Sequence, residues 1–190
     1  MVLLHGLGSN ADDLYPVAKQ LVADFGDAEF LIPDGFHASP NGGREWWSFQ
    51  GMTEANRMKR LRTAADELTP WLEARLKERS LGFEQLVLLG FSQGAALSSW
   101  VGAHRTLAGA VSWCGRGVSD GDSAVRTPML LINGGADPMV SPEDAQAFAE
   151  TLKSRQAPVT FSLHPALAHS LDRQSLEETR GFLRQALRGE

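Results

Sequence analysis

A serine between two glycines lies where an apolar run meets the start of a helical pattern. Residues 90–94 read Gly-Phe-Ser-Gln-Gly, which matches Gly-x-Ser-x-Gly, and the apolar run 86–89 precedes them. A strand that turns sharply into a helix at this motif exposes the serine hydroxyl, and any side chain at the two glycines would collide with the neighbouring elements. The start of the helix also favours developing negative charge. We therefore expect Ser92 to be a nucleophile rather than a capping serine in an ordinary turn.

A serine hydroxyl becomes an effective nucleophile when a histidine removes its proton and a carboxylate orients that histidine. In chains with this serine motif the acid and then the histidine follow the serine, each after a later strand. Asp137 follows the apolar run 129–133 through two glycines, and His169 lies in the loop after the next such run. We expect Asp137 and His169 to complete a triad. A turn or capping role is the alternative for Asp137, and His164 is the alternative base.

Attack on an acyl carbonyl creates an oxyanion, which backbone N–H groups stabilise. Removing one such donor costs roughly 3–4 kcal/mol in comparable enzymes. We expect one donor to be the N–H of Gln93, directly after the nucleophile, and the second to be the N–H of Leu7 in the glycine-rich loop 5–10. A plain turn is the alternative for this loop. A phosphate-binding loop is disfavoured because no Lys-Ser or Lys-Thr pair follows it.

Length and composition limit the class of protein. The 190 residues, 43% of them hydrophobic, suit a single domain over residues 1–190. The net charge of −5 and the scattered lysines and arginines disfavour binding to nucleic acid. One cysteine cannot form an intrachain disulfide. The chain has neither a basic signal-peptide start nor the ~20 consecutive apolar residues of a membrane helix, so we expect a cytoplasmic protein without stable membrane insertion.

The elements that must position these residues follow from the alternation of short apolar runs with helical patterns. This alternation predicts an α/β fold with a mostly parallel sheet of about six or seven strands and helices on both faces. No strand precedes the first one, so we expect an edge that needs cover, and either a fold with a minimal N-terminus or the loss of N-terminal residues. Pro70 should kink or divide its helix. The expected strands are 2–4, 29–32, 86–90, 109–113, 129–133 and 159–163, and the expected helices are 11–25, 54–79, 93–104, 142–155 and 172–187.

Residues 34–53 form a long excursion that mixes turn-forming glycines with large aromatic side chains. It is either a surface loop anchored by buried tryptophans or a wall over a substrate pocket near the active site. The side chains that we expect to line an apolar pocket are Trp46, Trp47, Trp113 and Met139, although Trp113 could equally lie in the core. The aromatic loop and the exposed first strand are compatible with a homodimer.

Four segments resemble motifs of one known family. Residues 3–14 (Leu-Leu-His-Gly-Leu-Gly-Ser-Asn-Ala-Asp-Asp-Leu) look like its opening motif, 43–48 (Gly-Arg-Glu-Trp-Trp-Ser) like its Arg-x-Trp-Phe segment, 90–95 like its nucleophile motif and 135–140 like its acid loop. The family is the phospholipase/carboxylesterase family of α/β-hydrolases, which includes the acyl-protein thioesterases. The segments occur in the family's order over nearly the whole chain, which makes the resemblance more specific than any single motif.

The resemblance implies an α/β-hydrolase fold and hydrolysis of small to medium acyl or aryl esters, or of thioesters, through an acyl-enzyme without cofactor or metal. Three features depart from the family. Ala168 precedes His169 where the family has Gly, Trp47-Ser48 replaces Phe-Asp, and the family's N-terminal strands are absent. These departures concern the acyl pocket, and so the substrate, rather than the triad. The alternative function is a small-molecule-binding protein of hydrolase fold without catalysis, which the presence of all three triad residue types disfavours.

Overall fold

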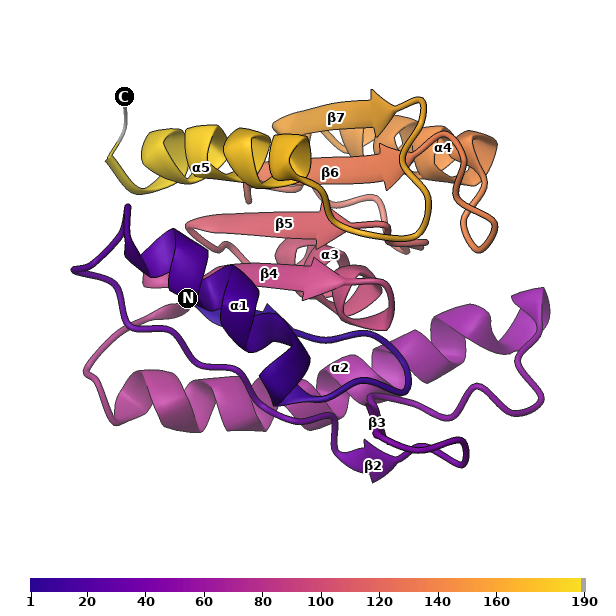
Figure 1. The fold of residues 1–190 in the computed structure, drawn as a ribbon, viewed down its shortest axis with the longest axis horizontal. Coiled ribbons are helices and arrows are strands. Elements are labelled where there is room, and N and C mark those ends of the chain that lie inside the picture. Colours follow the sequence, from indigo (N-terminus) through magenta and orange to yellow (C-terminus); the bar gives the residue numbers. More distant parts are fainter. Residues whose placement is uncertain (189–190) are drawn as a thin grey trace.

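The computed structural model describes residues 1–188, and its core is a sheet of five parallel strands between two layers of helices (Figure 1). The strand order is β1-β4-β5-β6-β7, and every neighbouring pair is parallel. Parallel strands end at the same edge, so the loops after them gather there. The strands are β1 (Val2–Leu4), β4 (Val87–Phe91), β5 (Gly109–Trp113), β6 (Met129–Gly134) and β7 (Val159–His164).

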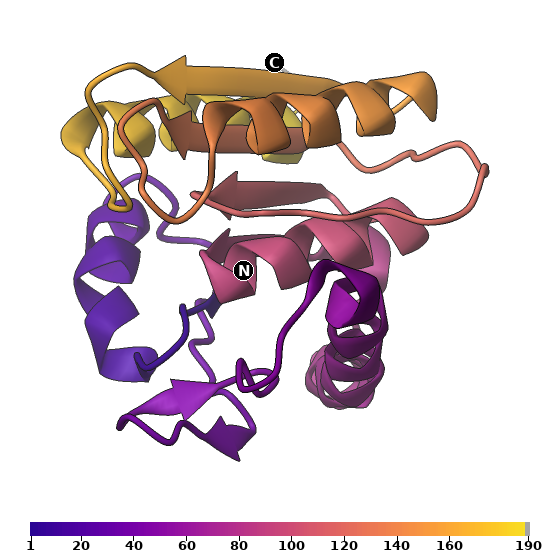
Figure 2. The ribbon, with the colours of Figure 1, turned by 90° about the vertical axis from the view of Figure 1, so that its right-hand side faces the viewer.

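Helices cover both faces of the sheet, as expected, and separate two apolar clusters. The helices are α1 (Ala11–Val22), α2 (Glu54–Lys77), α3 (Gln93–His104), α4 (Pro142–Ser154) and α5 (Arg173–Arg188), with a short 3-10 turn η1 (Phe83–Gln85). One cluster packs the sheet against α2, α3 and α4, and the other packs it against α1 and α5 (Figure 2). No helix within residues 1–188 is long and apolar enough to cross a membrane.

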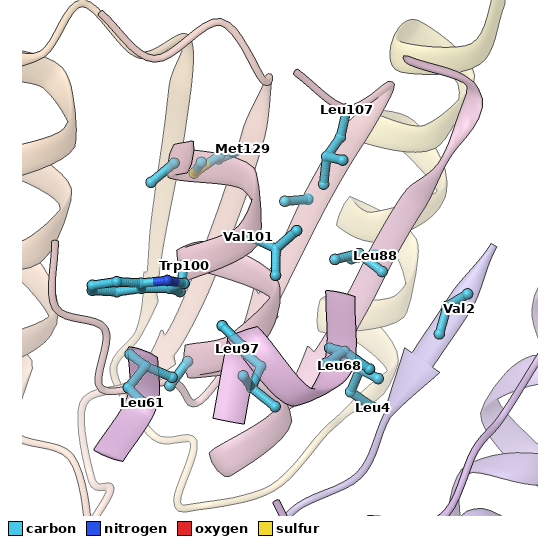
Figure 3. Close-up of a cluster of buried hydrophobic side chains, with 14 of the residues drawn as sticks. Val2, Leu4, Leu61, Leu68, Leu88, Leu97, Trp100, Val101, Leu107 and Met129 are labelled. Carbon is cyan, nitrogen blue, oxygen red and sulfur yellow. The ribbon is translucent and has the colours of Figure 1, made fainter. Parts of the chain in front are cut away.

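The continuous apolar runs of the strands follow from this two-sided cover. In β4, Leu88 belongs to the cluster under α3, whereas Val87 and Leu89 belong to the opposite cluster. Successive side chains of a strand point to opposite faces, so a strand covered on both sides needs apolar residues at every position. Figure 3 labels Leu88, Leu97 of α3 and Leu68 of α2, which belong to the same cluster.

The expected caps at the starts of two helices are confirmed, but the expected division of one helix is not. Ser141 caps α4 by accepting a hydrogen bond from the Asp144 N–H, and Asp172 accepts one from the Ser175 N–H at the start of α5. The expected division at Pro70 is wrong, because α2 runs from Glu54 to Lys77 without a break. Buried leucines lie on both sides of Pro70, and α2 contacts α3, so packing along the helix supports both parts.

The prediction of a strand over 29–32, and with it of six or seven strands, is wrong. Only Leu31 pairs with β1: the Leu3 N–H donates to Leu31 O, and the Leu31 N–H donates to Met1 O. β1 has three residues, and Pro33 has no N–H to continue the ladder. The segment still covers the outer edge of β1.

The excursion 34–53 contains a hairpin that periodicity did not predict. Its strands are β2 (His37–Ala38) and β3 (Arg44–Glu45), which pair antiparallel. The backbone of Arg44 also pairs with the loop after β1: the Gly8 N–H donates to Arg44 O, and the Arg44 N–H donates to Ser9 O. Gly43 has a φ of 69°, and a Cβ there would collide with Gly8 O. Glycine therefore allows the hairpin to approach this loop.

Candidate active site

Ser92 lies on a tight turn between β4 and α3, at the edge where the parallel strands end. Its φ of 54° and ψ of −109° place it in a conformation that non-glycine residues rarely adopt. A Cβ at Gly90 would collide with Gly94 O, and a Cβ at Gly94 would collide with Leu4 O. The steric requirement for both glycines is therefore confirmed, and the turn projects the Ser92 side chain out of the sheet.

Ser92, His169 and Asp137 form a continuous chain of hydrogen bonds. His169 Nε2 lies 2.9 Å from Ser92 Oγ, and His169 Nδ1 lies 2.7 Å from Asp137 Oδ2. The other carboxylate oxygen of Asp137 accepts the N–H groups of Met139 (2.7 Å) and Val140 (3.0 Å). The Asp137 side chain is fully buried, whereas that of His169 is 20% exposed. The loops after β4, β6 and β7 thus bring together three side chains that are far apart in the sequence.

The alternative base, His164, does not take part in this chain. It is buried at the end of β7, and its Nε2 lies 3.1 Å from Glu178 of α5. Asp172 lies on its other side, 3.6 Å from Nδ1. His164 therefore belongs to the contact between β7 and α5, and His169 is the histidine beside Ser92.

The two N–H groups expected to stabilise an oxyanion both lie next to this chain. Gln93 follows Ser92 directly, and Leu7 lies in the loop after β1, whose residue Gly6 packs against Phe91 and Ser92. Within residues 1–188, neither the Gln93 N–H nor the Leu7 N–H donates to a protein group. Both N–H groups are thus free of a protein acceptor close to Ser92 within the described residues.

The side chain of Gln93 fixes the excursion to the nucleophile turn, which sequence reasoning missed. Its Oε1 accepts the Trp46 N–H (2.7 Å), and its Nε2 donates to Trp47 O (2.8 Å). The Trp46 indole donates to His5 O (2.9 Å), and its ring packs between His5 and Phe36. The excursion is therefore anchored by a fully buried tryptophan and holds both the loop after β1 and the start of α3. The pattern in the sequence carries no signal for these contacts, because they link segments 40 residues apart or more.

The residues expected to line a pocket have separate locations. Trp46 and Trp47 line a cavity of about 710 Å3 between β3 and α2, to which no triad residue contributes within the described chain. Met139 is 65% exposed beside Asp137. The placement of Trp113 in the pocket is wrong: this side chain is fully buried, and its indole donates to Thr179 Oγ1 of α5 at 3.0 Å. Trp113 can lie in the core because α5, which covers this face of the sheet, supplies Thr179 as a polar partner for the indole.

Cys114 lies beside Asp137 and His169, and the three residues could together offer ligands to a metal ion. One possible ligand atom from each residue lies within 4.8 Å of the other two. Burial, reinforced by the negative charge of Asp137, raises the pKa of the Cys114 thiol to about 12. The thiol donates instead to Ser170 O at 3.3 Å. A metal ion would have to displace the thiol proton and break the Asp137–His169 hydrogen bond. The donor set therefore fits a metal poorly.

Comparisons with known proteins agree with this architecture. The family model described as Phospholipase/Carboxylesterase matches residues 1–187. Esterase YpfH of Escherichia coli (strain K12) is 30% identical over 191 residues, covering 98% of this chain and 82% of the relative. Acyl-protein thioesterase 1 of Gibberella zeae is 33% identical over 115 residues, covering 55% of this chain and 49% of the relative.

Solved structures share the fold over nearly the whole chain. Esterase PE8 superposes with a TM-score of 0.91 at 25% identity, covering 98% of this chain and 91% of that one. The Bacillus cereus carboxylesterase superposes with a TM-score of 0.82 at 22% identity, covering 97% and 87%. At 22% identity, the similarity to the Bacillus cereus carboxylesterase supports the fold alone.

The two hydrogen bonds between the Gln93 side chain and the backbone of residues 46 and 47 lead to a prediction on stability. Gln93→Ala keeps the backbone N–H but leaves the Trp46 N–H and Trp47 O without partners. We expect the free energy of unfolding, measured by urea denaturation, to fall by about 1–3 kcal/mol. The control Gln174→Ala, on the exposed surface of α5, should change it by less than about 0.5 kcal/mol. Equal losses of unfolding free energy in the two variants would show that the Gln93 side-chain hydrogen bonds do not stabilise the fold.

The raised pKa of Cys114 leads to a prediction on reactivity. Thiols react as thiolates, and a pKa of about 12 leaves almost no thiolate at pH 8. Iodoacetamide at pH 8 should therefore alkylate the native protein at least about 100-fold more slowly than the urea-unfolded chain, as followed by mass spectrometry. Rapid alkylation of the folded protein would show that the thiol is accessible and ionised.

Proposed function

The chain belongs to the phospholipase/carboxylesterase family, and from this premise we propose that it cleaves small to medium acyl or aryl esters and thioesters through a covalent acyl-enzyme on Ser92. As a member of this family it is a serine hydrolase that acts on ester bonds. The observation that carries the finer proposal is the hydrogen-bonded chain from Ser92 through His169 to Asp137. Such a chain matches the requirements of a nucleophile, a base and an orienting acid.

In the first half of the reaction, Ser92 Oγ attacks the carbonyl carbon of the substrate while His169 Nε2 takes the hydroxyl proton. The carbonyl π electrons move to the oxygen, and a tetrahedral oxyanion forms. Asp137 stays ionised, holds the Nδ1–H tautomer and stabilises the imidazolium. When the oxyanion collapses, the bond to the leaving group breaks, His169 returns its proton to the leaving alcohol or thiol, and the acyl group remains on Ser92.

The backbone N–H groups of Leu7 and Gln93 stabilise the oxyanion in this scheme. Both lack a protein acceptor within residues 1–188, so neither must break a hydrogen bond to the protein to bind the oxyanion. Each such donor lowers the barrier by roughly 3–4 kcal/mol in comparable enzymes. The N-terminus of α3 adds a favourable dipole at the same place.

In the second half, a water molecule replaces the leaving group. His169 Nε2 takes a proton from this water as its oxygen attacks the acyl carbon, and a second oxyanion forms between the same two N–H groups. Collapse breaks the bond to Ser92 Oγ, which regains its proton from His169, and the carboxylic acid leaves. Neither half-reaction as written calls for a metal or cofactor.

The substrate class is supported by the surroundings of the triad. Leu7 is 40% exposed and Met139 is 65% exposed, so apolar side chains adjoin both the proposed oxyanion loop and the acid. Apolar surface of this kind suits an acyl or aryl group. A thioester follows the same scheme with a thiol as leaving group, and one relative is named an acyl-protein thioesterase. The homodimer, the cytoplasmic location and the lack of nucleic-acid partners stay predictions from the sequence.

Rapid-mixing kinetics with p-nitrophenyl esters of two to ten carbons test this function. We expect a burst of p-nitrophenol equal to the enzyme concentration where deacylation limits turnover. Ser92→Ala should abolish the burst and lower kcat by at least about 10⁴-fold, because the nucleophile is lost.

The control is Ser123→Ala, which changes an exposed serine between β5 and β6. It should leave the burst and kcat unchanged. A Ser92→Ala variant that keeps its burst would exclude the acyl-enzyme on this residue. Absence of turnover at every chain length, together with failure of a fluorophosphonate to label Ser92, would instead indicate a binding protein.

A further inference from the structure

We propose that His5 is a positioning residue for the reaction: its ring holds the peptide group between Gly6 and Leu7 so that the Leu7 N–H faces the reacting carbonyl. This inference rests on the proposed function, because it concerns a donor of the proposed oxyanion hole. His5 is not part of the triad, and its side chain does not contact Ser92 in the hydrogen-bond network.

The contacts of the His5 ring determine which nitrogen carries the proton. Nε2 lies 2.8 Å from the Gly35 N, and a backbone N–H can only donate, so Nε2 accepts. The proton of the neutral ring is then on Nδ1, which lies 2.7 Å from Gly6 O and donates to it. Burial lowers the pKa of His5 below its ordinary value and so favours the neutral ring.

The hydrogen bond to Gly6 O acts on Leu7 because both belong to one peptide group. A peptide group is planar and trans, so its C=O and its N–H point in opposite directions. When the ring of His5 holds Gly6 O on one side, the Leu7 N–H must project on the other side. That N–H has no protein partner within the described chain. Gly6 O accepts the longer Ser9 N–H hydrogen bond (3.3 Å) as well as that of His5 (2.7 Å), and His5 is the side chain that acts on its direction.

The ring itself is held from several directions. The His5 side chain is completely buried and packs against the Trp46 ring at 5.4 Å between centroids. The carbonyl of His5 accepts both the Trp46 indole N–H (2.9 Å) and the Gly94 N–H (3.1 Å). His5 is thus fixed to the excursion and to α3 at once. A side chain with this support can impose an orientation on the Gly-Leu-Gly loop.

Two substitutions separate the positioning role from a purely structural one. The amide nitrogen of Asn occupies nearly the place of the histidine Nδ1, so His5→Asn can still donate to Gly6 O but loses the contact with Gly35. The amide oxygen of Gln reaches nearly the place of Nε2, so His5→Gln can still accept from Gly35 but loses the contact with Gly6. Each variant keeps one hydrogen bond, and only the bond to Gly6 bears on the Leu7 N–H.

The readouts are kcat, KM and inhibition by a trifluoromethyl ketone, which adds to Ser92 and places an oxyanion in the hole. Loss of one oxyanion donor lowers kcat by about 10²–10³-fold, and misorientation should cost less. We therefore expect His5→Gln to lower kcat by about 10–100-fold with KM within about threefold, and to weaken the inhibitor by the same factor as kcat. His5→Asn should retain kcat and inhibitor affinity within about threefold.

Thr179→Val is the matched control for stability, since it leaves the Trp113 indole N–H without its partner in the core, as His5→Asn does for the Gly35 N–H. It should lower the thermal stability similarly and leave kcat within about twofold. Equal kcat for the Asn and Gln variants, a larger loss for Asn, or a loss of kcat without a matching loss of inhibitor affinity would overturn the inference. Wild-type enzyme that the ketone does not inhibit would instead count against the proposed function.

The ¹⁵N chemical shifts of the wild-type His5 ring provide a test that does not depend on whether the variants fold. Protonated and unprotonated ring nitrogens have well-separated shifts. The geometry requires the proton on Nδ1 and an unprotonated Nε2. A proton on Nε2 at neutral pH would exclude donation to Gly6 O by the neutral ring and overturn the inference.

Discussion

The close approach of β1, β4 and α3 at the two glycines around Ser92 is the constraint on which the rest of the site depends. Because a Cβ at Gly94 would collide with Leu4 O, and one at Gly90 with Gly94 O, the turn can form only with glycine at both positions. The same approach lets the Gly94 N–H donate to His5 O, which places the loop after β1 beside the nucleophile. The strained backbone of Ser92 and the position of the proposed second oxyanion donor therefore have one physical origin.

The parts of the site that could be predicted from the sequence are those that a parallel sheet places by its topology. Ser92, Asp137 and His169 each follow a strand, and parallel strands bring their carboxyl ends to one edge. Two signals in the sequence, the glycine spacing around Ser92 and the order of the three residue types along the chain, then sufficed to name them. The helices and all five strands of the sheet were predictable for the same reason, since their patterns are local.

The rest could not be predicted because it depends on contacts between distant segments. The expected strand 29–32 reduces to one bridge at Leu31, because a three-residue β1 and Pro33 leave little to pair with. Trp113 looks like a pocket residue at a strand end until Thr179 of α5 supplies its partner. The roles of the Gln93 side chain and of His5 follow only from where the excursion lies in the fold.

The proposed mechanism requires a covalent bond between the acyl group of the substrate and Ser92. It is tested most directly by acid-quenching the enzyme during turnover of a p-nitrophenyl ester and locating the added acyl mass by peptide mass spectrometry. We expect a single acylated peptide, with the acyl group on Ser92, and a slower accumulation of this peptide in Asp137→Asn than in the wild type. An acyl group on another residue, or turnover with no covalent species under conditions that give a burst, would contradict it.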